Sequence, residues 1–197
     1  MAERRVVIGL SGVPGSGKTT LLRLLLKDFP GAETLAYDRL HPGMSEQQVE
    51  DWLRRGGDPN EMALDNLVAA LKDLTLLGAG GRSRSPVLFE SGFGRAHKAT
   101  GVFIDFSVWI DTPLDLAMSR AVQVFLRNVE LNPAPTAAAE FVPRLTRYMQ
   151  DYPMLRRMYL SVSERGLASA DLVIDGAQPA KVSTALIKKA LAERGIA

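Results

Sequence analysis

The stretch Gly12-Val13-Pro14-Gly15-Ser16-Gly17-Lys18-Thr19 decides the fold of this chain. It satisfies the pattern G-x-x-x-x-G-K-[ST], with the apolar run Val6–Leu10 before it and the helical pattern Thr19–Phe29 after it. A strand, a glycine-rich loop and a helix in this order predict a loop whose backbone N–H groups turn inward and bind phosphates at a helix N-terminus. The alternative is a glycine-rich turn with an incidental lysine.

Each side chain of this loop has an expected role. Lys18 reaches the β- and γ-phosphates of a nucleoside triphosphate, and the Thr19 hydroxyl binds magnesium. Thr20 completes the set of nucleotide-binding residues that begins at Gly12. We therefore expect ATP or GTP, together with Mg²⁺, as cofactors.

Short apolar runs alternate with longer helical patterns along the chain, which predicts an α/β fold. Because the runs are nearly continuous in apolar residues, we expect a five-stranded parallel sheet with helices on both faces, a P-loop NTPase three-layer sandwich. The expected strands are Arg5–Leu10, Glu33–Tyr37, Pro86–Glu90, Phe106–Ile110 and Leu172–Ile174.

Composition limits the other possibilities. The chain has 197 residues, 46% of them hydrophobic, which suits a single domain over residues 1–197. It has no cysteine and only 2 histidines, so a Cys-ligated zinc site is excluded and any metal should be bound by oxygen. The net charge of +2 is dispersed, and no apolar stretch is long enough to span a membrane. We expect a cytoplasmic protein with neither nucleic acid nor membrane as partner.

Turn and capping residues mark the element boundaries. Asp58-Pro59 and Thr112-Pro113 each fit a capping residue followed by proline at the first helical position, and Ser45 with Gln48 fits a capping box. Gly78–Pro86 reads as a loop, and Asn132–Thr136 separates two helices.

Carboxylates end three of the expected strands, at the edge of a parallel sheet where ligands bind. They are Asp38, Glu90 and Asp111. Asp111 directly precedes Thr112-Pro113, so a capping or turn role is at least as good an explanation for it. Asp38 and Glu90 are the favoured magnesium ligands beside Thr19, although each could simply end its strand.

The chain resembles the uridine kinase and phosphoribulokinase group of P-loop kinases, which includes the bacterial pantothenate kinases. The resemblance lies in Asp38 and in four segments: Gly9–Thr20 (GLSGVPGSGKTT), Gly56–Leu74 (GGDPNEMALDNLVAALKDL), Val87–Gly92 (VLFESG) and Trp109–Arg127 (WIDTPLDLAMSRAVQVFLR). It implies that Asp38 is the base that accepts a substrate hydroxyl proton and that Thr19 and Glu90 bind magnesium. It also implies that Arg120 and Arg127 lie over the phosphates, in a lid of about residues 120–136. Residues that grip a nucleobase acceptor have no clear counterpart here.

Four further residues are candidates for binding the acceptor: Tyr37, Asp58, Arg95 and His97. Asp58 competes with its capping role, and a lone histidine is more often a packing residue. Arg120 and Arg127 are seven apart and share a helix face, which suits phosphate binding but also ordinary solvation.

These observations favour an ATP-dependent kinase that phosphorylates a hydroxyl of a small molecule, which is nucleoside-, sugar- or pantothenate-like. Two alternatives stay open. One is a kinase for a nucleoside monophosphate or another metabolite, and the other is a regulatory NTPase, although the base-specificity motif N-K-x-D is absent. A homodimer is one expectation for the assembly.

Overall fold

A computed structural model describes residues 4–37, 45–76, 85–131 and 135–196. Five strands form one sheet in which every neighbouring pair is parallel, in the order β2-β3-β1-β4-β5. They are β1 (Val7–Ser11), β2 (Glu33–Ala36), β3 (Val87–Ser91), β4 (Phe106–Asp111) and β5 (Leu172–Asp175). The predicted five-stranded parallel sheet is confirmed, with strand ends within two residues of those expected.

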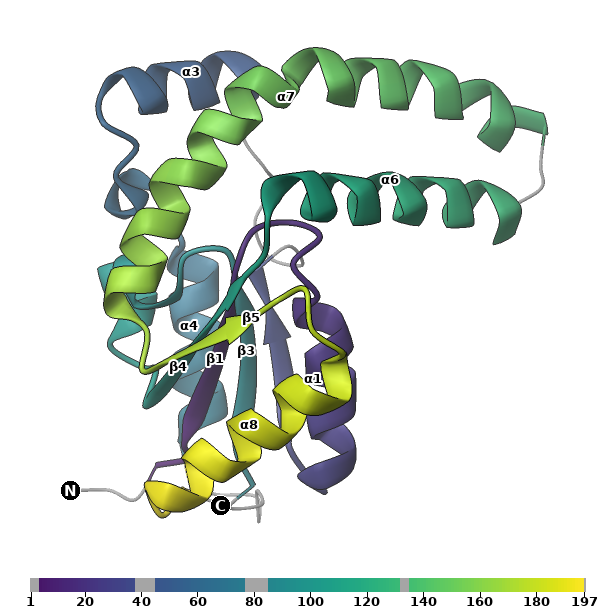
Figure 1. The fold of residues 1–197 in the computed structure, drawn as a ribbon. Coiled ribbons are helices and arrows are strands. Elements are labelled where there is room, and N and C mark those ends of the chain that lie inside the picture. Colours follow the sequence, from purple (N-terminus) through teal and green to yellow (C-terminus); the bar gives the residue numbers. More distant parts are fainter. Residues whose placement is uncertain (1–3, 38–44, 77–84, 132–134, 197) are drawn as a thin grey trace.

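Helices cover both faces of the sheet (Figure 1). They are α1 (Lys18–Asp28), α3 (Glu46–Arg54), α4 (Asp65–Thr75), α5 (Lys98–Gly101), α6 (Leu114–Leu131), α7 (Pro135–Ser169) and α8 (Ala180–Glu193), with short 3₁₀ helices η1 (Pro59–Glu61) and η2 (Gly94–Ala96). On one face, Leu25 of α1 and Leu191 of α8 pack with Leu10 of β1. On the other, Leu67 of α4 packs with Phe89 of β3.

The strand register decides which face each strand-end side chain occupies. Leu10 lies beside Glu90 and Val108, while Ser11 lies beside Ser91 and Trp109. Since side chains alternate between faces along a strand, Glu90 is on the same face as Leu10, the face that carries α1. A carboxylate at this position is therefore directed toward the helix that follows the phosphate loop.

Helices α6 and α7 form a long hairpin whose outer part projects beyond the sheet (Figure 1). Phe125 and Tyr148 pack edge to face with ring centroids 5.5 Å apart, Tyr148 packs on Tyr152 at 5.8 Å, and the Tyr152 hydroxyl donates to the Leu114 carbonyl at 3.0 Å. Burial, and secondarily the neighbouring Tyr152, raises the pKa of Tyr148. These tyrosines hold the two helices together.

The inner part of α7 packs on the sheet through a glycine. A Cβ placed on Gly166 would lie 2.0 Å from Cζ3 of the Trp109 indole, so only glycine allows the helix to approach this closely. Trp109 packs with Trp52 of α3 and Val162 of α7 in one buried cluster. Helix α3 is thereby tied both to α7 and, through Trp109, to the sheet.

Most predicted boundaries have counterparts in the structure. Ser45 and Gln48 form the expected capping box. Asp58 caps only the short η1, because α4 begins later, at Asp65. Of the break expected at Asn132–Thr136, residues 132–134 lie outside the described residues, whereas Pro135 and Thr136 already belong to α7. Most of the predicted loop Gly78–Pro86 also lies outside the described residues. No helix in the described ranges has the length and apolar character needed to cross a membrane.

Candidate nucleotide-binding site

The phosphate loop joins the carboxyl end of β1 to the first turn of α1. Gly15 and Gly17 have φ angles of 81° and 101°, in the left-handed region that favours glycine. A Cβ on Gly15 would lie 2.1 Å from the Ala117 carbonyl oxygen, so the loop rests directly on the backbone of α6. The glycines of the motif therefore have two roles: they allow left-handed backbone conformations, and they let the loop approach the backbone of α6 closely.

Lys18 lies over the loop that precedes it. Its ammonium group donates hydrogen bonds to the carbonyl oxygens of Gly12 at 2.8 Å and Val13 at 3.0 Å. The positive charge is therefore next to the loop that would bind phosphates, where the first turn of α1 adds its own positive partial charge.

A hydroxyl and a carboxylate meet at the start of α1. Thr19 Oγ1 donates to Glu90 Oε1 at 2.9 Å, and neither side chain is buried. Both are oxygen donors of the kind that Mg²⁺ prefers, and such sites often contain one or two carboxylates completed by water and substrate phosphates. The described residues contain no group of three or more His, Asp or Glu side chains that could hold a metal ion. The donor set fits magnesium.

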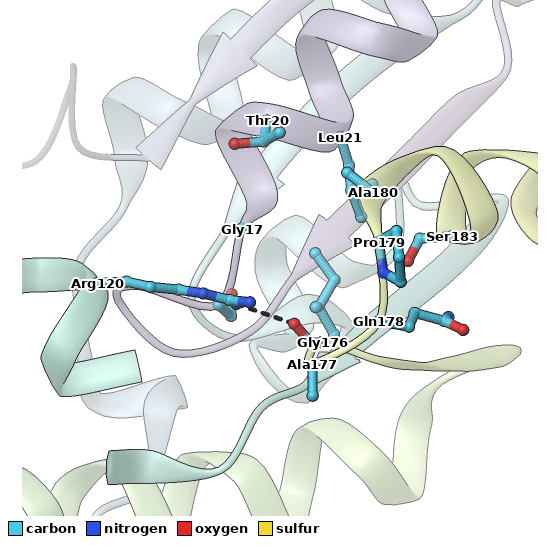
Figure 2. A pocket seen from close by; sticks show the side chains of 12 residues that line it. Gly17, Thr20, Leu21, Arg120, Gly176, Ala177, Gln178, Pro179, Ala180 and Ser183 are labelled. Atoms are coloured by element: carbon cyan, nitrogen blue, oxygen red, sulfur yellow. Dashed lines mark hydrogen bonds between the residues drawn. The ribbon is translucent and has the colours of Figure 1, made fainter. Parts of the chain in front are cut away.

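A pocket of about 390 Å³ adjoins the phosphate loop on the α8 side (Figure 2). Its walls come from four separate segments. They are the end of the phosphate loop with the first turn of α1, Ile110 of β4, Arg120 of α6, and the loop from β5 into α8. The Arg120 guanidinium donates to the Gly176 carbonyl at 2.9 Å and so forms one wall, with Gln178 and Pro179 across from it. Planar guanidinium groups stack on aromatic rings, so the pocket suits a nucleobase.

Thr112 connects the phosphate loop with this second loop. It is buried, and its hydroxyl donates to the Ser16 carbonyl at 3.4 Å. A Cβ on Gly176 would lie only 1.8 Å from Thr112 Oγ1, while the Gly176 N–H donates to the Asp111 carbonyl at 2.6 Å. The predicted capping role of Thr112 is wrong, because the Pro113 carbonyl accepts the first helical hydrogen bond, from the Ala117 N–H.

Asp58 and Tyr37 lie on the other side of the sheet, with α3 and α7. Asp58 accepts hydrogen bonds from the Asn60 N–H at 3.0 Å and from Asn60 Nδ2 at 2.7 Å, and Arg165 of α7 lies 3.4 Å away. The hydrogen bonds from Asn60, and then Arg165, hold the pKa of Asp58 below its usual value. Tyr37 packs edge to face on Phe93 at 5.5 Å. Both residues have structural contacts, and both keep part of their surface exposed.

Arg95 and His97 are placed differently from the prediction. Arg95 donates to the carbonyls of Ile104 at 3.2 Å and Asp105 at 2.7 Å and pairs with Asp171 at 2.6 Å. Residues 105 and 171 directly precede β4 and β5, so the guanidinium lies toward the amino ends of the strands, whereas the phosphate loop follows a carboxyl end. Arg95 therefore supports the fold and does not reach the phosphate site.

His97 is 2% exposed and caps α5. Its Nδ1 lies 2.9 Å from Thr100 Oγ1 and accepts from the Thr100 N–H at 3.3 Å, and its Nε2 lies 3.2 Å from the Met62 carbonyl. Both ring nitrogens are engaged within the fold, so a packing role replaces the predicted contact with substrate.

Two predicted residues stay without a described role. Asp38 lies outside the described residues. Arg127 is exposed, and its side chain makes no hydrogen bond or ion pair within the described part of the chain. Asp111, the third candidate acid, is also apart from the site. Its neighbour Ile110 packs on the face of the sheet that carries α1, so the Asp111 side chain lies on the opposite face from Glu90 and does not approach Thr19.

Sequence reasoning missed the loop Gly176–Ala180 and its buried neighbour Ser183. A signal for the loop was present, since it follows a strand of a parallel sheet, at the edge where such folds bind ligands. The contact of Thr112 with the phosphate loop could not be predicted from a local pattern, because its partner Ser16 is 96 residues away in the chain.

Comparison with known structures identifies the fold. The crystal structure of shikimate kinase from Aquifex aeolicus VF5 superimposes with a TM-score of 0.51 and 18% sequence identity, over 97% of this chain and 99% of that one. The chain shares the fold of shikimate kinase. An unliganded sugar kinase from Janibacter sp. HTCC2649 matches with a TM-score of 0.43 and 17% identity, over 98% of this chain and 96% of that one.

Sequence comparison adds no family. No family model matches the chain, and no curated protein matches it. At these identities the structural likeness establishes the P-loop kinase fold alone. The resemblance to the uridine kinase and phosphoribulokinase group is not confirmed.

Proposed function

We propose that this protein is an ATP-dependent kinase that transfers the γ-phosphoryl group to a hydroxyl of a small molecule. The observation that carries the proposal is the contact of 2.9 Å between the Thr19 hydroxyl and the Glu90 carboxylate, at the first turn of α1. This contact brings a hydroxyl from α1 and a carboxylate from β3 together beside Lys18, as a magnesium nucleotide site requires. The fold shared with shikimate kinase supports the same class of reaction.

The reaction requires little covalent chemistry from the protein. The acceptor oxygen attacks the γ-phosphorus, the bond between this phosphorus and the β–γ bridging oxygen breaks, and ADP leaves. In this proposal Asp38 accepts the hydroxyl proton, and Lys18 balances the charge that develops on the phosphate oxygens. Thr19 and Glu90 would hold Mg²⁺, which would supply further charge neutralisation on these oxygens.

The donor site extends from the phosphate loop into the pocket beside Arg120. In this proposal the base lies between the Arg120 guanidinium and the loop Gly176–Ala180, with the triphosphate along Gly12–Thr20. This changes the role of Arg120 from a phosphate-binding lid residue to a wall of the base pocket. Arg127, seven residues further along α6, keeps the lid role as a proposal.

The acceptor site is proposed on the opposite side of the phosphate loop, at the carboxyl ends of β2 and β3. Tyr37 and Asp58 are its candidate residues among those described. The resemblance to the uridine kinase and phosphoribulokinase group suggests a nucleoside-, sugar- or pantothenate-like alcohol, and the shared fold adds the hydroxylated ring acid shikimate to the acceptors worth testing.

An ADP-release assay tests the proposal. The acceptor panel contains nucleosides, sugars, pantothenate, shikimate and nucleoside monophosphates, with Lys18→Ala as the blank. We expect turnover with one class of alcohol and a fall of at least about 10²-fold in Asp38→Asn with little change in ATP binding. Asp111→Asn, a strand-end acid on the other face of the sheet, is the matched control and should keep full activity.

Three results would contradict the proposal in different ways. Steady ATP hydrolysis without any acceptor would support a regulatory NTPase instead. Turnover only with monophosphates would support the other kinase class, in which the acceptor is a phosphate and no hydroxyl base is needed. Unchanged turnover in Asp38→Asn would remove Asp38 from the mechanism.

A further inference from the structure

A groove of about 750 Å³ lies between the first turn of α6 and the inner part of α7. Leu114, Asp115 and Met118 line it from α6, whereas Ala117 of the same helix touches the phosphate loop and Arg120 lines the base pocket. The groove is thus on a different side of α6 from the proposed active site. The proposed reaction therefore does not explain what this groove binds.

The groove combines an apolar lining with acidic groups. Leu114, Met118, Leu160 and Leu167 contribute the apolar surface, and Leu160 is 46% exposed. Three carboxylates, Asp111, Asp115 and Glu164, stand around it with one arginine, Arg156. None of these four charged side chains makes a hydrogen bond or ion pair within the described ranges of the chain. An apolar groove with a net negative charge suits an occupant that is apolar and basic.

The length of the groove favours a helix as the occupant. Its α7 wall runs from Tyr152 to Leu167, which corresponds to about 22 Å of helix. These residues follow one face of α7 at helical spacing. Helices commonly bind in such grooves by inserting apolar residues spaced three and four apart.

The chain itself carries a helix with the complementary surface. On α8, Val182 and Leu186 are four residues apart and are 46% and 43% exposed, although α8 buries its other face in the core. Lys181 makes no ion pair within the described residues, and Lys189 has only a distant contact of 3.9 Å with the exposed Glu193. At 14 residues, α8 is about 21 Å long. Its outer face combines apolar residues with two lysines and one acid, Glu193, so its net charge is positive, and its length matches that of the groove.

We propose that the protein forms a homodimer in which the outer face of α8 from each copy docks into the α6–α7 groove of the other. Val182 and Leu186 pack on Leu160 and its apolar neighbours, and Lys181 and Lys189 face the carboxylates of the groove. In a two-fold dimer each copy provides one groove and one α8, so two equal contacts form at once. This proposal does not depend on the proposed reaction.

Sedimentation velocity of the full chain over a concentration series, up to roughly 1 mM, tests the dimer. We expect a concentration-dependent dimer whose dissociation constant rises at least about tenfold when Leu160→Asp places a charge in the apolar groove. Lys72→Glu, an exposed lysine of α4 that lines neither the groove nor the outer face of α8, is the charge-change control and should leave the dimer intact. The melting temperature of each variant establishes that it is folded.

Charge reversal tests the occupant. Reversing the groove with Asp111→Lys, Asp115→Lys and Glu164→Lys should break the dimer, and reversing α8 with Lys181→Glu and Lys189→Glu should also break it. Combining both sets in one chain should restore it, because the two surfaces are again complementary. A wild-type protein that stays monomeric throughout the series would overturn the proposal, as would a dimer that none of these substitutions weakens.

Discussion

Single residues of the phosphate loop have roles that depend on the size and chemistry of their side chains. Gly15 adopts a left-handed conformation and also touches the backbone of α6, so any side chain there meets Ala117. Thr19 has a hydroxyl that reaches Glu90, 71 residues away in the chain. Both residues were identified from their spacing in the motif. Thr19 and Glu90 were expected to share a magnesium ion, whereas the contact of Gly15 with α6 was not expected.

Substituting Gly15 by alanine should destabilise the protein and abolish ATP binding. The left-handed conformation alone costs an alanine about 1–2 kcal/mol, and the clash with the Ala117 carbonyl at 2.1 Å adds to this cost. Gly56→Ala is the matched control, because its φ is 106° but a Cβ there meets nothing within 4 Å. Thermal unfolding of both variants measures the difference, and equal losses would contradict the close approach of the loop to α6.

Replacing Thr19 with valine should weaken magnesium-dependent ATP binding roughly 10- to 100-fold, because it removes one oxygen donor while keeping the shape of the side chain. Thr19→Ser keeps the hydroxyl and should stay close to wild type. Titration calorimetry with ATP, in the presence of Mg²⁺ and after its removal with EDTA, measures the effect. If valine and serine behave alike, the hydroxyl is not a ligand.

At the scale of elements, the amino ends of β4 and β5 are joined by one carboxylate. Asp171 accepts a hydrogen bond from the Ser107 N–H at 2.8 Å and pairs with Arg95 of η2 at 2.6 Å and Arg194 at 2.9 Å. Burial by itself would raise the pKa of Asp171, but the Ser107 and Arg194 hydrogen bonds and the two arginine charges outweigh it and hold the pKa below its usual value. The residue therefore links the β3–β4 connection with the region after α8.

Asp171→Asn should lower the free energy of unfolding by about 1–3 kcal/mol at neutral pH, because two arginines lose a charged partner at a side chain only 14% exposed. A carboxylate with a lowered folded-state pKa stabilises above its unfolded pKa of about 3.9 and loses this effect as the pH falls through the folded value. The difference between wild type and Asp171→Asn should therefore shrink below about pH 4.

Chemical denaturation at several pH values measures this trend. Glu193→Gln is the control, since Glu193 is 65% exposed and its ion pair with Lys189 spans 3.9 Å, so its loss should change stability little at any pH. A difference between wild type and Asp171→Asn that stays constant from neutral to acidic pH would show that charge is not the cause.

On the scale of the whole molecule, the pocket beside the phosphate loop exists only because four distant segments meet. The end of the phosphate loop, Ile110 of β4, Arg120 and the loop Gly176–Ala180 come together where the sheet places β1 beside β4 and β4 beside β5. The α6–α7 hairpin, whose first turn rests on the phosphate loop, then decides that Arg120 points into this pocket.

Arg120→Ala should raise the dissociation constant for ATP about tenfold, since it removes the wall of the pocket that stacks on the base. Arg127→Ala is the matched variant, one α6 arginine for another, and should leave ATP binding nearly unchanged while lowering turnover if Arg127 serves as a lid residue. Fluorescence titration with an adenine-labelled nucleotide gives the dissociation constants. If both variants lose ATP affinity equally, the two arginines share a phosphate-binding role and Arg120 is not a wall of the base pocket.

The sequence by itself determined the features whose signals are local. The glycine spacing from Gly12 to Gly17, the helix Lys18–Asp28 and the five apolar runs could be identified because each depends on the preferences of residues adjacent in the chain. The strand-end position of Glu90 and the capping box at Ser45 belong to the same group. These were enough to predict a parallel α/β sheet with a phosphate loop.

Only the tertiary structure decided what surrounds that loop. It placed Arg120 in the wall of the pocket beside the phosphate loop and turned Arg95 toward the amino ends of the strands. It also engaged both nitrogens of His97 within the core and brought Thr112 to Ser16. The physical reason is that these contacts follow from strand order, strand register and the close approach of helices at glycines. Those properties arise from packing between segments far apart in the chain, and no local pattern of residues encodes them.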